Sequence, residues 1–312
     1  MSKTSNSDNT KSKSDAAKIS ACLWFNDQAE EAAAFYTSIF PNSRITGTTT
    51  YTEVGQDQHG RQPGSVMTVT FEIDGFGFTA LNGGPHFTLN PSISFFVHCE
   101  TIEETDRLWQ ELSRDGAVLM PLDAYPFSER YGWVQDRFGV SWQVIVSPAA
   151  ATHRIVPSFL FVGDVCGKAE EAMRYYASVF SNASVGDIAR YGAEHAPNRE
   201  GTVMYGEFQM EGQPFVAMDS ADEHAFSFNE AISLIVDATS QEEIDSYWRA
   251  LSAVPDAEQC GWLKDRYGVS WQIFPETEMN RILQSADDAQ KNRTLEAMFQ
   301  MKKIDLAALR RG

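Results

Sequence analysis

The sequence has few cysteines, few basic residues and no long hydrophobic run. Its four cysteines, Cys22, Cys99, Cys166 and Cys260, are spread over 312 residues without a C-x-x-C motif. Thiols spaced in this way are typical of a reduced, cytoplasmic protein rather than of a disulfide-rich secreted one. No segment approaches the run of about 18 apolar residues that a membrane-spanning helix requires. We therefore expect neither disulfides nor a transmembrane segment.

Positive charge is scarce throughout the chain. Lys and Arg total 25 against 43 Asp and Glu, which gives a formal net charge of -18 at pH 7. Because an acidic surface repels phosphate backbones and anionic lipid headgroups, we expect no nucleic acid and no membrane among the partners. Hydrophobic residues make up 43% of the chain, which is enough to build packed cores and argues against global disorder.

The signatures of several large enzyme classes are absent as well. The chain contains no G-x-x-x-x-G-K-[ST] phosphate loop, no G-x-G-x-x-G nucleotide turn and no G-x-S-x-G nucleophile elbow. A Rossmann-type methyltransferase that uses S-adenosylmethionine is therefore disfavoured. No cysteine has a neighbour in the sequence that would activate it, so the pattern indicates no catalytic thiol, and the catalytic residues stay unknown.

What the sequence does contain is an internal repeat. The segment GWVQDRFGVSWQV, residues 132–144, recurs as GWLKDRYGVSWQI at residues 261–273, with nine of 13 positions identical. Upstream, residues 29–42 match residues 169–182 in the same order. These collinear matches indicate a tandem duplication of about 130 residues. The offset between the copies shrinks towards the end, which predicts that the second copy lacks a loop around residues 120–130.

Each copy carries the same order of predicted elements. In the first copy we expect a strand at 18–25, a helix at 28–40 and strands at 43–52, 65–73 and 76–82, then a strand at 92–99, a helix at 101–114 and strands near 117–121, 131–135 and 141–146. The whole chain thus forms four βαβββ modules in an α+β fold. The predicted domains are a disordered tail at 1–17, a first repeat at 18–150, a second repeat at 151–275 and C-terminal helices at 276–312.

This module order resembles the vicinal oxygen chelate superfamily of glyoxalase I, bleomycin-resistance proteins and extradiol dioxygenases. The segments CLWFNDQAEEAAAFYTSIFPNSRI, LNGGPHFTLNPSISFFVHC and DRFGVSWQVIV, together with the tail MFQMKKIDLAAL, are similar to its PhnB-like subfamily. Members of that subfamily often carry the label 3-demethylubiquinone-9 3-methyltransferase domain. The resemblance covers roughly residues 18–312. It implies curved sheets in which two modules form half-barrels that close a cavity.

The resemblance also identifies where metal ligands would stand. In metal-dependent members, four inward-facing strand positions carry residues such as His and Glu. The position on the last strand of each copy falls on Gln143 and Gln272, and no His, Glu or Asp stands at the other positions. We therefore predict that the metal site is lost and that no cofactor is bound, with a divalent metal as the alternative. His86 and His224 lie in equivalent loops, and their role is left open.

Strand alternation then indicates which side chains face the cavity. If Gln143 faces inward, Ser141 and Ile145 share that face, and Trp142 packs under the helices. The residues that we predict to bind a ligand are Trp24, Thr79, Ser94, Trp133, Gln143, Ser233, Trp262 and Gln272. An apolar pocket with a few neutral polar groups suits an uncharged or weakly polar small molecule.

The favoured function is a PhnB-like, glyoxalase-fold protein that binds an unidentified small molecule without a catalytic metal. One alternative is a metal-dependent enzyme of the glyoxalase or dioxygenase type with atypical ligands, and a second is the methyltransferase of the subfamily label. Because the chain holds two copies, we expect a monomer that resembles a fused dimer, with a homodimer as the alternative. The first module could close with the second or with the fourth.

Overall fold

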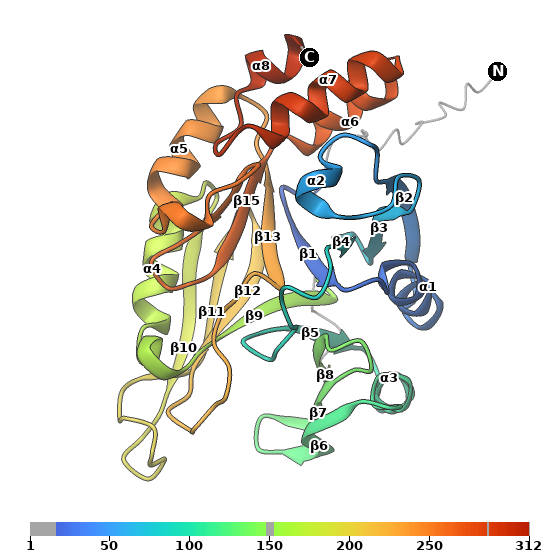
Figure 1. The fold of residues 1–312 in the computed structure, drawn as a ribbon. Helices are drawn as coiled ribbons and strands as arrows, with labels where there is room; N and C mark the ends of the chain where they lie inside the picture. Colours follow the sequence, from blue (N-terminus) through green and yellow to red (C-terminus); the bar gives the residue numbers. More distant parts are fainter. Residues whose placement is uncertain (1–16, 148–152, 286, 312) are drawn as a thin grey trace, which may run out of the picture.

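The computed structural model describes residues 17–147, 153–285 and 287–311, so the predicted tail lies outside the described residues except for Ala17. Figure 1 shows sheets and helices followed by a group of C-terminal helices. Within the described ranges, no helix combines the length and the apolar character needed to cross a membrane.

The elements follow the chain in four modules and a tail. The first module comprises β1 (Ile19–Phe25), α1 (Ala29–Ile39), β2 (Ser43–Thr50), the short α2 (Gln56–His59), β3 (Val66–Ile73) and β4 (Phe76–Asn82). The second comprises β5 (Ile93–Cys99), α3 (Ile102–Leu112), β6 (Ala117–Tyr125), β7 (Ser128–Gln135) and β8 (Ser141–Val146).

The second repeat follows the same plan. The third module comprises β9 (Ile155–Phe161), α4 (Ala169–Val179), β10 (Ser184–Arg190), β11 (Val203–Met210) and β12 (Gln213–Asp219). The fourth comprises β13 (Ile232–Asp237), α5 (Gln241–Leu251), β14 (Trp262–Lys264) and β15 (Ser270–Phe274), and the tail forms α6 (Glu276–Ser285), α7 (Asp288–Phe299) and α8 (Leu306–Arg311). The predicted α+β fold in two tandem repeats is confirmed.

The fourth module differs from the other three in one edge strand. Between α5 and β14 the chain forms only a single 3-10 turn, Pro255–Ala257, where the second module has the nine-residue strand β6. The shorter second repeat has therefore lost a strand of its hairpin, whereas the sequence predicted the loss of a loop. As a result, the short strand β14 is the edge of its sheet.

Each of the two sheets combines one module from each repeat. Sheet A has the strand order β14-β15-β13-β1-β4-β3-β2, and sheet B has the order β10-β11-β12-β9-β5-β8-β7-β6. The modules join through antiparallel pairs in both sheets, β1 with β13 and β5 with β9. The first module therefore closes with the fourth, and the second with the third, which decides between the two pairings that the sequence left open.

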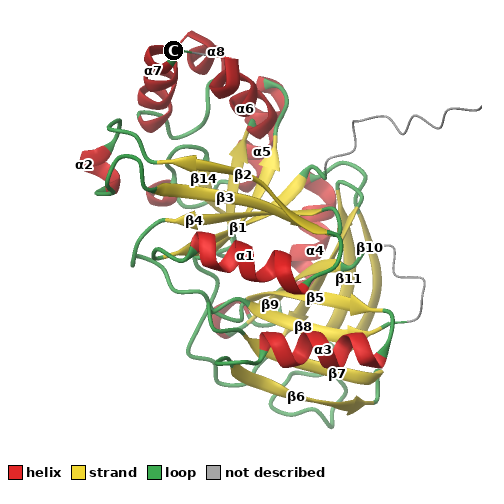
Figure 2. Ribbon diagram, turned by 90° about the vertical axis from the view of Figure 1, so that its right-hand side faces the viewer, coloured by secondary structure: helices red, strands yellow, loops and turns green. Residues whose placement is uncertain are grey.

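The hydrophobic core lies between the helices and the outer faces of the two sheets. Figure 2 shows α1 packed beside the strands of sheet A and α3 packed beside those of sheet B. The largest fully buried side chains include Trp142 and Trp271, which occupy equivalent positions on β8 and β15. Because successive strand residues point to opposite faces, burying these tryptophans turns their neighbours towards the inner, hollow face of each sheet.

Two equivalent aspartates connect the modules of each repeat through this core. Tyr36 of α1 and Trp142 of β8 donate hydrogen bonds of 2.7 and 2.8 Å to one carboxylate oxygen of Asp136, and the other oxygen accepts two backbone N–H groups. Asp265 has the same set of partners in the second repeat. Each module is therefore bonded to one neighbour through the core and to another through its sheet.

Candidate functional site

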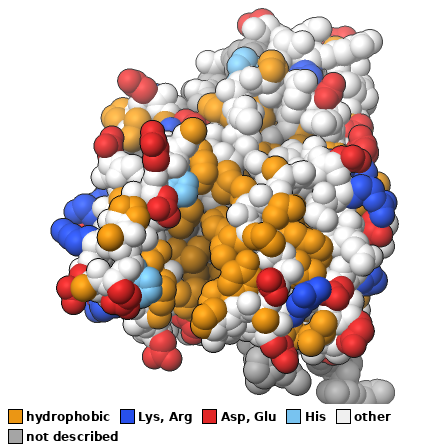
Figure 3. All heavy atoms as spheres, turned by 90° about the horizontal axis from the view of Figure 1, so that it is seen from below, with side chains coloured by type: hydrophobic (Ala, Val, Ile, Leu, Met, Phe, Trp, Pro, Cys, Tyr) orange, Lys and Arg blue, Asp and Glu red, His pale blue; other side chains and the backbone are white. Residues whose placement is uncertain are grey.

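The hollow face of sheet B carries a hydrophobic cluster that is separate from the main core. We call this face cup B. Its buried members are Phe96, Tyr131, Val156 and Val216, and Met120, Tyr125, Trp133, Ile145, Tyr205 and Met218 pack against them. In the view from below, hydrophobic side chains gather around a hollow in the middle of the molecule (Figure 3). These residues come from β5 to β9, β11 and β12, so both modules of sheet B contribute to the wall.

Neutral polar side chains form the floor of cup B. Tyr131 donates a hydrogen bond of 2.6 Å to Oε1 of Gln143, and Nε2 of Gln143 donates one of 2.8 Å to Oγ of Ser94. Ser94 lies opposite Ser158 in the register of β5 and β9. The Ser158 hydroxyl is buried and has no hydrogen-bond partner among the residues that the structure describes. The floor therefore contains one hydroxyl whose hydrogen-bonding capacity is unused.

Burial keeps the titratable groups of cup B neutral. Desolvation raises the pKa of Tyr131 well above its usual value, so its phenol stays protonated and able to donate. The pKa of His98 is lowered because its ring is largely removed from water, and its Nδ1 lies 2.7 Å from Oγ of Ser147. A charged ligand would meet no group of opposite charge on this floor.

The hollow face of sheet A, which we call cup A, is more polar. Thr79, Cys22, Ser233 and Ser270 form one row across β4, β1, β13 and β15. Nε2 of Gln272 donates a hydrogen bond of 2.9 Å to Oγ of Ser233. Burial raises the pKa of Cys22 to about 12, so its thiol is uncharged at neutral pH.

The predicted tryptophans occupy different positions in the two cups. Nε1 of Trp24 donates to the carbonyl of Gly84 at 2.8 Å, and its ring meets the edge of Trp262 with centroids 6.2 Å apart. Both residues belong to sheet A. In cup B, Nε1 of Trp133 donates a hydrogen bond of 2.7 Å to Oγ of Ser141. The Trp24–Trp262 contact joins the first module to the fourth, which is a packing role.

The structure divides the eight predicted ligand residues between two separate faces. Cup B contains Ser94, Trp133 and Gln143, and cup A contains Trp24, Thr79, Ser233, Trp262 and Gln272. Phe96, Tyr131 and Ser158 were not among the residues predicted to bind a ligand. Phe96 and Tyr131 stand two residues from Ser94 and Trp133 respectively, so strand alternation could have identified them. Ser158 depends on the β5–β9 register, which no local pattern specifies.

The inward-facing residues do not fit a divalent cation. Within the described residues, no group of three or more His, Cys, Asp or Glu side chains is placed to hold a metal. The rows across the floors of the two cups carry neutral hydroxyl and amide groups and the protonated thiol of Cys22, which are weak ligands for a dication. His224 instead contacts Ser220 at 2.8 Å, and His86 lies beside the Trp24 ring. The absence of a cofactor stays a prediction.

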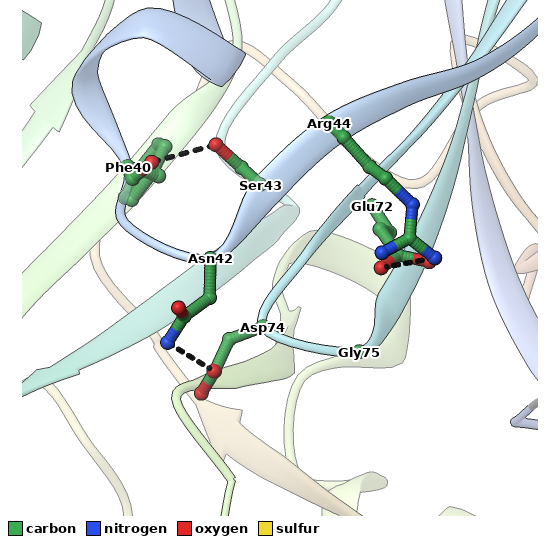
Figure 4. A pocket seen from close by; sticks show the side chains of 7 residues that line it. All are labelled: Phe40, Asn42, Ser43, Arg44, Glu72, Asp74 and Gly75. Carbon is green, nitrogen blue, oxygen red and sulfur yellow. Dashed lines mark hydrogen bonds and ion pairs between the residues drawn. The ribbon is translucent and has the colours of Figure 1, made fainter.

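Two surface cavities lie away from both sets of predicted residues. One, of about 380 Å³, lies at the ends of β2, β3 and β4, where Arg44 pairs with Glu72 at 2.9 Å and Asn42 donates to Asp74 (Figure 4). The other, of about 560 Å³, lies between the N-terminus of α5 and α8. The polar groups in the first cavity already pair with one another, so the cups remain the better candidates.

Comparison with proteins of known structure identifies similar folds. A PhnB protein from Bacillus cereus is 41% identical over 42% of this chain and 99% of its own, with a TM-score of 0.38. Glyoxalase I from Zea mays covers 84% of this chain and 94% of its own at 9% identity, with a TM-score of 0.52, which shows a shared fold alone. A search among curated proteins finds no match.

The B. cereus protein is about as long as one repeat, whereas the maize enzyme spans nearly the whole chain. The family described as 3-demethylubiquinone-9 3-methyltransferase matches this sequence twice, at residues 17–145 and 153–274. These two matches coincide with the two copies found in the sequence. The chain therefore belongs to the 3-demethylubiquinone-9 3-methyltransferase family, as a tandem duplication of a PhnB-like unit with the glyoxalase fold.

Proposed function

We propose that this protein binds a small, uncharged and mostly apolar molecule in cup B. The unpartnered hydroxyl of Ser158, buried beside an aromatic wall, is the observation that carries the proposal. A buried hydroxyl without a partner costs about 1–3 kcal/mol, so such groups in native proteins call for an explanation. A ligand oxygen that reaches Ser158 would satisfy it.

The chemistry of the cup defines the ligand class. Phe96, Tyr131 and Trp133 offer flat apolar surfaces, on which aromatic or extended aliphatic groups pack well. Burial of apolar area contributes roughly 25 cal/mol per Å², so a ligand that covers this wall gains most of its affinity from it. The hydroxyls of Ser94 and Ser158 favour a carbonyl, ether or hydroxyl oxygen as the single polar group.

The same residues favour binding over chemistry. Tyr131 is held neutral by burial, and Gln143 can neither donate nor accept a proton in a reaction. The floor therefore orients a ligand without activating it, which is the behaviour of a carrier or of a protein that sequesters a compound.

The test is a titration with Nile red, an uncharged apolar fluorophore, followed by competition with aromatic ketones. We expect one Nile red site per chain, with tryptophan emission partly quenched on binding. Val216→Trp should fill cup B and abolish binding, while Val118→Trp, at an exposed position on β6, should leave it intact. Equal binding by both variants would refute the assignment to cup B.

A chelator separates this proposal from the metal-dependent alternative. We expect Nile red affinity to be unchanged after dialysis against EDTA, and metal analysis of the purified chain to find no stoichiometric dication. A dication at one per chain, lost together with ligand affinity, would favour the metal-dependent enzyme instead. A parallel titration with S-adenosylmethionine tests the methyltransferase alternative, for which we expect no heat of binding.

A further inference from the structure

We propose that the C-terminal segment, residues 276–285 and 287–311, is a cover that bridges the mouth of cup A. This segment lies beyond both matches to the family, which end at residue 274. In Figures 1 and 2, α6 and α7 lie on the side of sheet A away from α1, while α8 lies beside α5. The segment contacts both rims of the cup and reaches towards the floor.

The segment is bonded to one rim where an edge strand is missing. Three hydrogen bonds connect residues 259–261, which precede β14, to the carbonyl oxygens of Phe299, Met301 and Lys302, at 2.8, 2.8 and 2.7 Å. In sheet B the strand next to β7 is β6. The loss of the β6 counterpart therefore leaves backbone N–H groups of the second repeat for the C-terminal segment to bind.

The same few residues reach the opposite rim. The ring of Phe299 packs against Gly55, in the β2–β3 connection, so closely that a Cβ at Gly55 would lie 2.9 Å from it. The ring of His59 also lies near Phe299, and the centroids of these two rings are 6.4 Å apart. Since β14 and β2 are the two edge strands of sheet A, residues 299–302 bridge the mouth of the cup from rim to rim.

The start of the segment descends towards the floor. Thr277 donates to the carboxylate of Asp237 at the end of β13, at 2.6 Å. Glu276 is close enough to Cys22 to affect its titration, and both groups are shielded from water. Met279 and Ile282 of α6 are 4 and 5% exposed. The start of the cover therefore lies at the end of β13, beside the row of neutral groups in cup A.

Comparison of the two copies shows where the C-terminal segment is anchored. In the first repeat, Gly132 lies beneath the ring of Trp109 from α3. At the equivalent position of the second repeat, Gly261 lies beneath Ile304 of the C-terminal segment. Because Gly132 faces α3 on the outer side of its sheet, the equivalent contact places Ile304 on the outer side of sheet A, where it anchors the C-terminal segment.

The accessibility of Cys22 tests this inference in the full chain. In a background with Cys99, Cys166 and Cys260 changed to serine, Cys22 is the only thiol and reports on cup A. In the same background, Cys22→Ser with Ser158→Cys places the only thiol in cup B. Because Cys22 and Ser158 are both almost fully buried, each thiol reacts only when its cup opens, and we expect a thiol reagent to label Ser158→Cys faster than Cys22, whose cup is covered. Similar rates for the two thiols would overturn the cover.

A second experiment tests whether the cover opens without global unfolding of the protein. Phe299→Ala removes the ring that packs on Gly55, and we expect it to speed Cys22 labelling by about tenfold while the thermal midpoint stays unchanged. Val118→Ala, at an exposed site outside the cover, is the control. Labelling of Cys22 that follows global unfolding in every variant would show a fixed structural element instead and would reject an opening cover.

Hydrogen exchange gives a readout that needs no substitution. The amides of Cys260 and Gly261 donate to the cover, whereas the amide of Ile273 donates to Gly261 within the sheet. We expect the first two to exchange faster than Ile273 through a local opening. Exchange of all three at the global unfolding rate would contradict a cover that moves.

Discussion

At the scale of single residues, each cup has one buried serine hydroxyl with a partner and one without a partner among the described residues: Ser233 and Ser270 in cup A, Ser94 and Ser158 in cup B. In cup B, Ser94 accepts a hydrogen bond from Gln143, while the neighbouring Ser158 has none from the described residues. The two hydroxyls lie opposite each other on adjacent strands and are equally buried. The proposed function assigns the unbonded hydroxyl of this pair to a ligand and the bonded one to the structure of the floor.

Substitution of these two serines should therefore have opposite effects on stability. Ser158→Ala removes an unsatisfied hydroxyl, so we expect the thermal midpoint of the free protein to rise by about 2 °C. Ser94→Ala leaves the Gln143 amide without its acceptor and should lower the thermal midpoint. Differential scanning calorimetry measures both. A fall in midpoint for Ser158→Ala would mean that its hydroxyl is already bonded in solution.

Asp136 makes stability depend on pH. Burial raises its pKa from 3.8 to about 6 even though it accepts several hydrogen bonds. Between about pH 4 and about pH 6 the folded state therefore binds more protons than the unfolded state. The contribution of Asp136 to the free energy of unfolding thus falls as the pH rises through this window, and it is constant above it. Asp265 shifts in the same direction for the same reason.

Urea unfolding across this pH window measures the effect. We expect Asp136→Asn to reduce the pH dependence, since an amide does not titrate. It should also lower the free energy of unfolding by about 2 kcal/mol, because Tyr36 or Trp142 loses an acceptor. Asp265→Asn is the matched variant in the second repeat. An unchanged pH profile in both would mean that these carboxyl groups titrate at ordinary values.

At the scale of elements, helix α3 depends on a glycine of the strand beneath it. A Cβ at Gly132 of β7 would lie 2.5 Å from the Trp109 ring, so the helix packs on the strand only because that position lacks a side chain. We expect Gly132→Ala to lower the free energy of unfolding by about 2 kcal/mol through overpacking, as measured by chemical denaturation. Gly75→Ala, where a Cβ meets open space, controls for the intrinsic cost of losing a glycine.

The Gly75→Ala control also changes the strain of the backbone at its own position. Gly75 has a φ of +85°, so alanine is strained there, whereas Gly132 is not among the glycines with positive φ. If Gly132→Ala lowered the free energy of unfolding by less than Gly75→Ala, the ring of Trp109 would therefore move aside at little cost. The comparison separates crowding between elements from strain within one element.

At the scale of the whole molecule, both sheets are complete within one chain. The joins β1–β13 and β5–β9 are made between repeats, so no second chain is needed to supply a module. We expect a monomer of 34.8 kDa by light scattering coupled to size-exclusion chromatography. A mass about twice this value, independent of concentration, would indicate a homodimer and would move attention to the exposed side chains of β6 and its turn, such as Val118 and Phe127.

Family membership and the candidate site rest on different kinds of evidence. The repeated segments around Trp142 and Trp271 were sufficient to predict the duplication, the module order and the family, because strands and helices impose short periods on the residues they contain. The same alternation correctly placed Gln143 and Gln272 on faces opposite the buried tryptophans. Metal loss, ligand binding and a cytoplasmic location stay predictions.

The sequence by itself determined the two copies, the order of their elements and the neutral chemistry of the inward-facing positions. Only the tertiary structure decided that the first module pairs with the fourth, that the predicted residues belong to two cups, and that the C-terminal helices lie over one of them. The reason is physical. Local periodicity reflects backbone geometry within a few residues, whereas the pairing of β1 with β13 depends on contacts between segments more than 200 residues apart, which no local pattern records.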